Sequence, residues 1–297
     1  MTRPSDWHAL RSIPRKANVL LRPFFQAAIG ALGLLGIVYV EGGRAWAALG
    51  DIVRRPLPAI LLGTLAIAAP FLLISLGELV VPSVLAGVLV SSTPMFVALF
   101  ALRLDPSAEI NRRQALGLVV GIFGVALVVG LQAVGTLGQL LGALAILGAA
   151  ASGGLSSFVV KLQYQDKGVP ASTTTLFSLS VGSVLTLPVA IITAERHVPG
   201  ARAVIVLGLV CTALAFTLYY SLIAQVGEER AAIGNYLTPI FALFYGVVLL
   251  GEHLTIAAVV GLALIIVGAE ITLRGDSARR AGGKATAHQY RPHPPFH

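Results

Sequence analysis

The chain has 297 residues, of which 56% are hydrophobic and only 11% are charged. Soluble domains usually carry about 25% charged residues, so this composition excludes a water-soluble globular protein. A helix needs roughly 20 apolar residues to cross a bilayer, and the chain therefore accommodates about nine or ten crossings. The formal net charge of +8 is spread over loops and tails instead of one basic surface, which argues against nucleic acid as a partner. The sequence predicts a polytopic helical membrane protein that binds no nucleic acid.

Metal and redox chemistry are not indicated by the sequence. The single cysteine, Cys211, cannot form an intramolecular disulfide, and Cys and His residues do not cluster with the spacing of a zinc site. We therefore expect no metal and no cofactor. An integral-membrane enzyme would need clustered His, Asp or Glu at a membrane face, and the loops are too short and too poor in these residues. The sequence thus favours a protein that is not an enzyme.

Apolar stretches bounded by charged residues, Pro or Gly predict where the chain crosses the membrane. Nine stretches meet this description, at residues 24–40, 57–76, 80–102, 112–131, 137–160, 170–193, 203–224, 231–250 and 255–273. The carboxyl tail and the loops on its side hold fourteen Lys and Arg residues, whereas the loops on the opposite side hold two. Because positively charged loops are retained in the cytoplasm, we expect the carboxyl terminus to be cytoplasmic.

The two halves of the chain are similar to each other, which indicates an internal repeat. A shift of 145 residues aligns Ser92-Thr93-Pro94-Met95-Phe96 with Leu237-Thr238-Pro239-Ile240-Phe241, Gly63 with Gly208, and Phe71 with Phe216. A shift of 144 residues aligns Gly117 and Gly124 with Gly261 and Gly268. The second copy contains five spans, and an odd number gives a complete first copy the opposite orientation. Inverted repeats are typical of transporters, whose substrate site forms near the membrane midplane between the copies.

The first copy contains four spans, one fewer than the second. The alignment would place its opening helix before residue 16, where the sequence is polar. With nine spans the amino terminus would lie outside, although residues 1–23 carry five Lys and Arg residues. We therefore expect a first repeat whose opening helix is missing, either through a misplaced start codon or in a true nine-span variant.

The end of the second copy carries the pattern of a known family. The pattern consists of Tyr236-Leu237-Thr238-Pro239, Gly251-Glu252-His253-Leu254-Thr255, and Gly261 with Gly268. It resembles the closing signature of EamA-domain proteins in the drug/metabolite transporter superfamily. In the first copy, Asp105-Pro106-Ser107-Ala108-Glu109 replaces the Gly-Glu loop. The resemblance covers about residues 24–273 and implies ten helices in two inverted repeats, cytoplasmic termini and transport of small metabolites, often export.

The expected fold class is an all-α polytopic membrane protein with two inverted repeats of the EamA type. Its expected parts are a polar basic segment at 1–23, a four-span repeat at 24–131, a five-span repeat at 132–275, and a disordered cytoplasmic tail at 276–297. The tail is expected to be disordered because it is terminal and its last residues are rich in Pro.

Polar residues precede a proline near the middle of corresponding spans in both copies. They are Ser91, Ser92 and Thr93 before Pro94, and Asn235, Tyr236 and Thr238 before Pro239. A proline inside a helix removes one backbone hydrogen bond and frees a carbonyl, so these groups are candidates for binding a substrate. The alternative is a packing kink in which a neighbouring Ser or Thr satisfies the freed carbonyl.

Three further polar residues are candidates for lining the same cavity: Ser156, Thr217 and Tyr220. The alternative for Ser156 is close helix packing, which small residues permit. The alternative for Tyr220 is anchoring at the membrane interface, since it lies toward the end of its span.

The acidic residues bear on the mechanism. No Asp or Glu lies in the central third of any predicted span, although proton-coupled transport usually requires a carboxylate at membrane depth. This pattern favours facilitated or exchange-type transport, with the solute held by hydroxyl, amide, backbone and aromatic groups.

These features together predict a transporter of small metabolites in the bacterial cytoplasmic (inner) membrane. We expect an exporter or exchanger of amino-acid-like or other small polar or amphipathic solutes that works by alternating access. Its expected partners are a small-molecule solute and the lipid bilayer, and the small residues of Gly117-x-x-x-Gly121 and Gly138-x-x-x-Gly142 are compatible with a homodimer. The alternatives are a transport-incompetent scaffold with a truncated first repeat and, less favoured, an integral-membrane enzyme.

Overall fold

A computed structural model describes most of the chain, and every regular element in the described part is a helix. The described residues are 4–289 except 55, 105–110, 133–135, 164–168, 194–200, 228–230, 232–239, 242–243, 246–247 and 249–254. The expected all-helical fold is confirmed.

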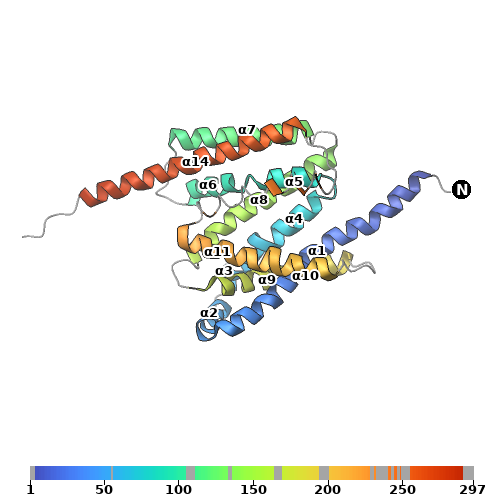
Figure 1. Cartoon of the computed structure of the whole chain (residues 1–297), viewed down its shortest axis with the longest axis horizontal. Coiled ribbons are helices and arrows are strands. Elements are labelled where there is room, and N and C mark those ends of the chain that lie inside the picture. The colour runs from blue at the N-terminus through green and yellow to red at the C-terminus, as the bar shows by residue number, and fades with distance from the viewer. Residues whose placement is uncertain are drawn as a thin grey trace, which may run out of the picture.

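The helices form a bundle whose long members run in roughly one direction (Figure 1). In chain order they are α1 (Pro4–Glu41), α2 (Gly43–Arg54), α3 (Pro56–Gly63), α4 (Ala69–Gly77), α5 (Ser83–Val90), α6 (Thr93–Leu104), α7 (Arg112–Gln132), α8 (Leu137–Gln163), α9 (Ala171–Thr193), α10 (Ala201–Gly208), α11 (Ala215–Val226) and α14 (Ile256–Gln289). Two π-helical segments, η1 (Thr64–Ala68) and η3 (Leu209–Leu214), join α3 to α4 and α10 to α11.

Seven described segments are helical, long and apolar enough to cross a membrane. They are Leu20–Glu41, Pro56–Gly77, Ser83–Phe100, Arg112–Val129, Leu137–Val160, Ala171–Thr193 and Val204–Val226, and each coincides with an expected span. The span expected at 255–273 corresponds to a shorter apolar helix, Ile256–Thr272, at the start of α14. The span expected at 231–250 lies largely outside the described residues.

Both end helices continue beyond the expected membrane spans. α1 begins at Pro4, so most of the polar segment 1–23 is helical and continuous with the first span. α14 ends at Gln289, so helix extends into the tail that was expected to be disordered from residue 276. That part of the tail contains several Ala and Arg residues, which are good helix formers.

Contacts between α7 and α14 show that the two copies are inverted. A Cβ added to Gly117 would lie 2.6 Å from the carbonyl oxygen of Gly268, and a Cβ added to Gly124 would lie 2.8 Å from the carbonyl oxygen of Gly261. In the repeat Gly117 corresponds to Gly261, and Gly124 corresponds to Gly268. Gly117 therefore packs against the counterpart of Gly124, and Gly124 packs against the counterpart of Gly117. A two-fold axis produces such reciprocal contacts. The pairing runs in opposite directions along the two helices, and α7 and α14 are therefore antiparallel (Figure 1).

A second reciprocal contact involves α1 and α9, the spans that precede η1 and η3 in their repeats. Gly63, at the end of α3, packs against Val181 of α9, whereas its counterpart Gly208, at the end of α10, packs against Ile29 of α1. α3 packs on α9 as α10 packs on α1, so the same axis relates these four helices, and each repeat is packed into the other.

Two large hydrophobic cores hold the bundle together, and α8 contributes to both. One core contains Leu62 of α3, Leu179 of α9 and Val160 of α8, all buried. The other contains Ile146 of α8 and Ile265 of α14, also buried. α8 therefore runs from one core to the other and connects the two.

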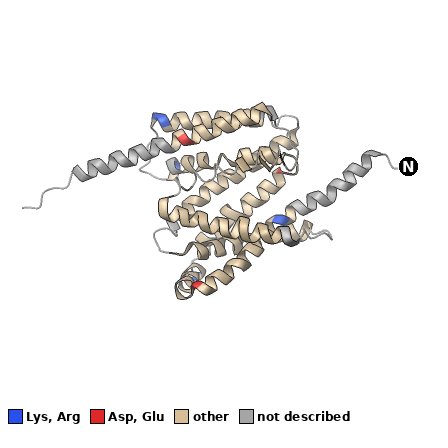
Figure 2. Cartoon of the chain, in the orientation of Figure 1, with Lys and Arg blue, Asp and Glu red and all other residues tan. Residues whose placement is uncertain are grey.

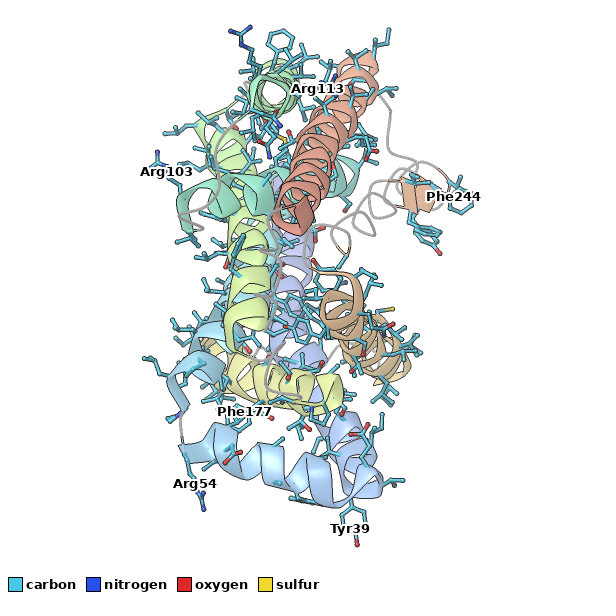
Figure 3. The ribbon with its side chains drawn as sticks, turned by 90° about the vertical axis from the view of Figure 1, so that its left-hand side faces the viewer. Tyr39, Arg54, Arg103, Arg113, Phe177 and Phe244 are labelled. Carbon is cyan, nitrogen blue, oxygen red and sulfur yellow. The ribbon has the colours of Figure 1, made fainter. Side chains whose placement is uncertain are left out.

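Charged side chains in the described part of the chain lie toward the two ends of the bundle, left and right in Figure 2. Arg54, Arg103 and Arg113 are exposed at the end of the bundle that faces the viewer in Figure 3. The midsections carry apolar side chains on their outer surfaces, including Phe123 of α7 and Val184 of α9. This distribution fits a bilayer around the midsections.

Replacing Gly268 by valine should destabilise the fold. A Cβ at this position would lie 2.4 Å from the backbone nitrogen of Gly121 and 2.6 Å from the carbonyl oxygen of Gly117, so α7 and α14 would have to separate. Overpacking of this kind costs about 1–3 kcal/mol. We expect a lower midpoint of thermal unfolding in detergent, measured by size-exclusion chromatography of heated samples. Gly36→Val is the control, because nothing lies within 4 Å of its Cβ position. An equal loss in both variants would contradict this packing role.

Candidate transport cavity

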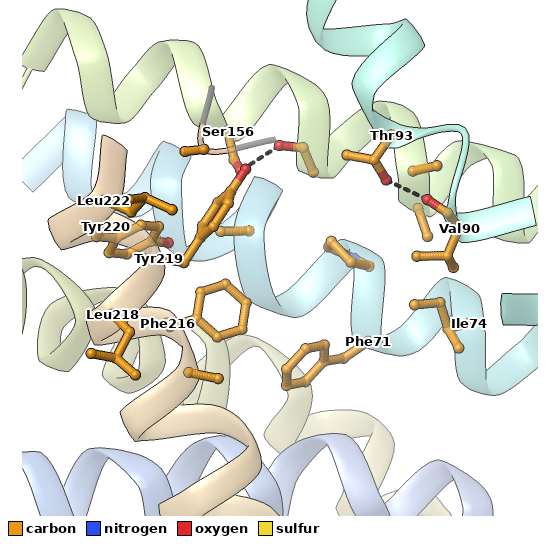
Figure 4. A pocket seen from close by; sticks show the side chains of 17 residues that line it. Phe71, Ile74, Val90, Thr93, Ser156, Phe216, Leu218, Tyr219, Tyr220 and Leu222 are labelled. Atoms are coloured by element: carbon orange, nitrogen blue, oxygen red, sulfur yellow. Dashed lines mark hydrogen bonds between the residues drawn. The ribbon is translucent and has the colours of Figure 1, made fainter. Parts of the chain in front are cut away.

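A cavity of about 630 Å³ lies within the bundle (Figure 4). Its described lining comes mainly from α4, α8 and α11, with single residues from α5, α6 and η1. The lining residues are Ala66, Pro70, Phe71, Ile74, Val90, Thr93, Ala149, Ala150, Gly153, Ser156, Ala215, Phe216, Leu218, Tyr219, Tyr220, Leu222 and Ala231. Among these residues there is no Asp, Glu, Lys, Arg or His. The cavity is thus aromatic and apolar with a few hydroxyl groups.

Two aromatic rings meet at the cavity across the repeat axis. The ring centroids of Phe71 and Phe216 are 6.3 Å apart in an edge-to-face arrangement, and both side chains line the cavity (Figure 4). These residues are equivalent in the 145-residue repeat. A residue that contacts its own counterpart must lie close to the two-fold axis, so the cavity adjoins the place where the two repeats meet.

Three of the expected site residues border this cavity: Thr93, Ser156 and Tyr220. The Ser156 hydroxyl donates to the Gly153 carbonyl at 2.7 Å. The Tyr220 ring is 2% exposed and contacts the ring of Phe216 at a centroid distance of 5.7 Å. The repeat places Thr93 in the first copy and the other two in the second, so tertiary packing brings them together.

Thr217 occupies a different position. Its hydroxyl donates to the Ala213 carbonyl of its own helix at 2.7 Å, and it is not among the described lining residues. Its neighbours Phe216 and Leu218 do line the cavity. Thr217 therefore contributes to the hydrogen bonding of its helix and does not border this space.

The span around Pro94 is broken, whereas the sequence suggested a kink. α5 ends at Val90, Ser91 and Ser92 form a turn, and Pro94 lies in the first turn of α6. A proline is tolerated there because the first helical N–H groups have no intrahelical acceptor. The break lies inside the most deeply buried of the seven spans.

Hydroxyl groups satisfy the carbonyls at this break. Ser91, Ser92 and Thr93 each donate to the carbonyl three residues earlier, at 2.5, 2.6 and 2.7 Å. Thr93 donates to the carbonyl of Val90 (Figure 4). In a regular helix this carbonyl would accept from the N–H of residue 94, but Pro94 has no N–H. All three residues are buried, and only Thr93 is among the described lining residues of the cavity. In this conformation their hydroxyls bond to backbone, as the packing alternative describes.

The second expected cluster cannot be compared with the first. Asn235, Tyr236, Thr238 and Pro239 lie outside the described residues. Ala231, which precedes them, lines the cavity. Their role in binding stays a prediction.

A second irregularity adjoins the cavity at η1. The N–H of Ala69 donates to the carbonyl of Thr64, and residue 70 is a proline without an N–H. Neither residue therefore donates a hydrogen bond to the Leu65 carbonyl. The hydroxyl of Ser152, on α8, donates to that carbonyl at 2.8 Å. A side chain from the second repeat thereby completes the backbone hydrogen bonding of the first.

The equivalent segment η3 is also linked to the opposite repeat. The Thr212 hydroxyl donates to the Leu207 carbonyl at 2.8 Å and accepts a hydrogen bond of 2.6 Å from the side-chain amide of Gln26 on α1. Both π-helical segments follow paired glycines, and each is bonded by a polar side chain of the other repeat. Single-turn π segments of this kind occur frequently at functional sites.

Four cavity-lining residues are not among the expected site residues: Pro70, Phe71, Phe216 and Tyr219. The sequence feature that could have identified the two phenylalanines is their alignment at the 145-residue shift, which served only to establish the repeat. For Tyr219 the only indication in the sequence is its position beside Tyr220. In the structure its hydroxyl lies 3.4 Å from that of Ser157. Because an aromatic residue in a membrane helix can face lipid or the interior, composition could not select these residues.

An inverted-repeat helical bundle with a cavity at the junction of its repeats is an architecture typical of membrane transporters. The chain belongs to the EamA-like transporter family, whose sequence profile matches it twice, at residues 7–130 and 140–274. It is therefore a multi-pass membrane protein of a transporter family, as its sequence signature suggested.

Similar proteins agree with this assignment. The "Uncharacterized transporter YoaV" of Bacillus subtilis is 26% identical over 269 residues, which cover 88% of this chain and 89% of that protein. The "Uncharacterized transporter YdfC" of the same species is 27% identical over 80% of this chain and 76% of that protein. A solved crystal structure shares the fold with a TM-score of 0.62 and 21% identity, over 93% of this chain and 94% of that chain.

Ser152→Ala should destabilise the protein, because the Leu65 carbonyl would lose its donor inside the bundle. Leaving a buried acceptor unsatisfied costs about 1–3 kcal/mol. The cost should fall in a Pro70→Ala background, since an alanine N–H at position 70 can reach the Leu65 carbonyl five residues earlier. A double-mutant cycle on thermal unfolding in detergent measures this coupling.

Ser180→Ala is the matched control for this cycle. The Ser180 hydroxyl bonds the Leu176 carbonyl within its own helix at 2.8 Å, and its loss should have the same small effect with or without Pro70. Additive effects of Ser152→Ala and Pro70→Ala would contradict the assigned role of the Ser152 hydroxyl.

Proposed function

We propose that this protein moves small amphipathic solutes without net charge across the bacterial cytoplasmic membrane, as an exporter or exchanger. The observation that supports this most is the cavity beside the repeat axis. Four aromatic rings line it, from Phe71, Phe216, Tyr219 and Tyr220, and the other described lining residues are aliphatic or carry a hydroxyl.

The size and chemistry of the cavity indicate the class of solute. A volume of about 630 Å³ falls within the range of sites for small organic molecules, roughly 300–1,000 Å³. An ion would lose its hydration there without a charged partner among the described lining residues, at a large cost in free energy. The cavity therefore favours solutes that combine an apolar or aromatic surface with a few hydrogen-bonding groups.

The inverted repeats support alternating access as the mechanism. If each repeat adopts the conformation of the other, the bundle takes a second arrangement of the same helices. In this second arrangement the cavity would open to the opposite side of the membrane. η1 and η3 occupy equivalent positions beside the cavity, where interrupted helical hydrogen bonding lowers resistance to bending. We propose that these segments are the places where α3 and α4, and α10 and α11, change their relative angles.

We further propose that the carboxyl terminus is cytoplasmic. Arg54, Arg103 and Arg113 are exposed at one end of the bundle, and the loops of that end hold most of the Lys and Arg residues of the sequence. The homodimer stays a prediction. The Cβ positions of Gly117, Gly121 and Gly142 face Thr272, Met95 and Val80 of the same chain, so these glycines already serve contacts within one molecule.

Expression of the protein should change the pool of excreted metabolites, and Phe216→Ala should reduce that change at least about ten-fold. The substitution removes one aromatic ring from the solute site, together with its edge-to-face contact with Phe71. An aromatic pair contributes about 0.5–1.5 kcal/mol beyond the area it buries. Untargeted mass spectrometry of the medium, followed by flux measurements in reconstituted vesicles, provides the readout. Asn235→Ala and Thr238→Ala test the second predicted cluster in the same assay.

The control is Phe123→Ala, because the Phe123 side chain is 61% exposed on the outer surface of α7. It should leave flux near the wild-type level. If no solute pool tested shows flux with folded wild-type protein, the transporter proposal fails and the scaffold alternative is favoured.

A pH gradient alone should not drive accumulation of the solute. No described lining residue carries a carboxylate that could bind and release a proton. In vesicles loaded with solute on one side only, flux should stop when the concentrations are equal, with or without a pH difference. Accumulation against a concentration gradient, driven by pH alone and abolished by a protonophore, would overturn the facilitated or exchange mechanism.

A further inference from the structure

We infer that α2 lies in the headgroup layer of the membrane and binds anionic phospholipid headgroups. This inference does not depend on the solute or on the transport mechanism. It follows from the orientation of α2, from the three different faces that the helix presents, and from the charge of its sequence.

The orientation of α2 differs from that of the long helices. In Figure 1 α7 is seen from the side and α2 end-on, whereas in Figure 3 α7 is seen end-on and α2 from the side. α2 therefore runs across the direction of α7. Its 12 residues span about 18 Å, which is too short for the hydrocarbon core. A short helix across the spans, at the end that carries Arg103 and Arg113, lies along the surface of a surrounding bilayer.

The first face of α2 packs on the bundle. Ala45 and Ile52 are buried, and Leu49 packs against the same core, which includes Leu34 and Leu179. A turn at Gly42, whose φ of 74° favours glycine, directs the chain from α1 into α2. These contacts hold α2 in a fixed orientation, so its other two faces also have fixed directions.

A hydrogen bond fixes the start of α2 from the opposite repeat. The Ser172 hydroxyl, at the beginning of α9, donates to the Glu41 carboxylate at 2.5 Å. Glu41 is the last residue of α1 and immediately precedes the turn. The position of α2 is thus coupled to α9 as well as to α1.

The second face of α2 is apolar and exposed. Trp46 and Val53 are separated by two helical turns and lie on one side, with exposed fractions of 44% and 60%. The Trp46 ring contacts that of Tyr39 edge-to-face, at a centroid distance of 6.5 Å. Tyr39 and Val40 are exposed on α1, so the apolar face of α2 continues the outer surface of a membrane span. Tryptophan and tyrosine concentrate at this depth, where an apolar ring and a polar group can both be accommodated.

The third face is polar and points away from the other two. Asp51 and Arg54 are exposed. They lie four and seven residues after Ala47, which places all three residues on one face of the helix. The segment 43–55 contains three Arg residues and one Asp, and so has a net positive charge. A helix with an apolar side, an aromatic anchor and basic residues binds at the interface of anionic membranes.

Tryptophan fluorescence tests the position of α2 directly, because Trp7 and Trp46 are the two tryptophans of the chain. Trp7→Phe leaves Trp46 as a single reporter. In phosphatidylcholine vesicles, bromine near the headgroup end of the acyl chains should quench Trp46 more than bromine near their middle. Acrylamide, a quencher in water, should have little effect.

The matched control moves the reporter to the polar face. Ala47→Trp in a Trp7→Phe, Trp46→Phe background should be quenched by acrylamide and only weakly by brominated chains. Equal acrylamide quenching at both positions, or deeper bromine quenching Trp46 more, would overturn the interfacial placement. Because Trp46 is a native residue, the main measurement requires only the change at position 7.

Headgroup binding is tested with brominated phosphatidylglycerol against brominated phosphatidylcholine at equal mole fraction. A basic residue near the surface enriches anionic lipid locally by up to about five-fold, so phosphatidylglycerol should quench Trp46 more. Arg54→Gln should reduce this preference. Arg103→Gln, an exposed arginine at the same end but outside α2, should leave it unchanged. Equal quenching by the two lipids in the Trp7→Phe protein would overturn the anionic-lipid assignment, whatever the outcome of the flux measurements.

Discussion

Every backbone polar group inside the bilayer must find a partner within the protein, because the hydrocarbon core contains no water to replace a lost hydrogen bond. The two proline-containing irregularities beside the cavity obey this constraint in different ways. At the α5–α6 break the Thr93 hydroxyl bonds the Val90 carbonyl locally. At η1 the donor for the Leu65 carbonyl is Ser152 of α8. The second arrangement ties the irregular backbone of one repeat to a helix of the other.

Glycine permits the close helix contacts on which the repeat interface depends. Small residues are the usual solution in membranes, since association of helices relies on packing and not on removal of apolar surface from water. The reciprocal contacts of Gly117 with Gly268 and of Gly124 with Gly261 leave no room for a side chain. They fix α7 against α14, while the helices that line the cavity use larger side chains and leave a space between them.

Membrane spans could be predicted well from the sequence because each helix satisfies its own backbone hydrogen bonds, and a long apolar stretch is sufficient to identify it. The break at Pro94 was harder to predict. A proline in an apolar stretch is compatible with a kink or with two separate helices, and the choice depends on whether neighbouring hydroxyls can serve the freed carbonyls. Ser91, Ser92 and Thr93 do so here, and this local bonding also reduces what their hydroxyls can offer a solute.

The sequence by itself determined the class of protein, the positions of most spans and the existence of two related copies, because these depend on composition and on spacing along the chain. Only the tertiary structure decided which residues border the cavity. Phe71 and Phe216 are 145 positions apart and meet because a two-fold relation brings equivalent residues together at its axis. Thr217 and Phe216 are adjacent in the sequence, yet only Phe216 faces that space, since each residue of a helix points about 100° away from the one before it. The direction of a side chain toward lipid, a neighbouring helix or the cavity is a property of the packed bundle and not of the residue.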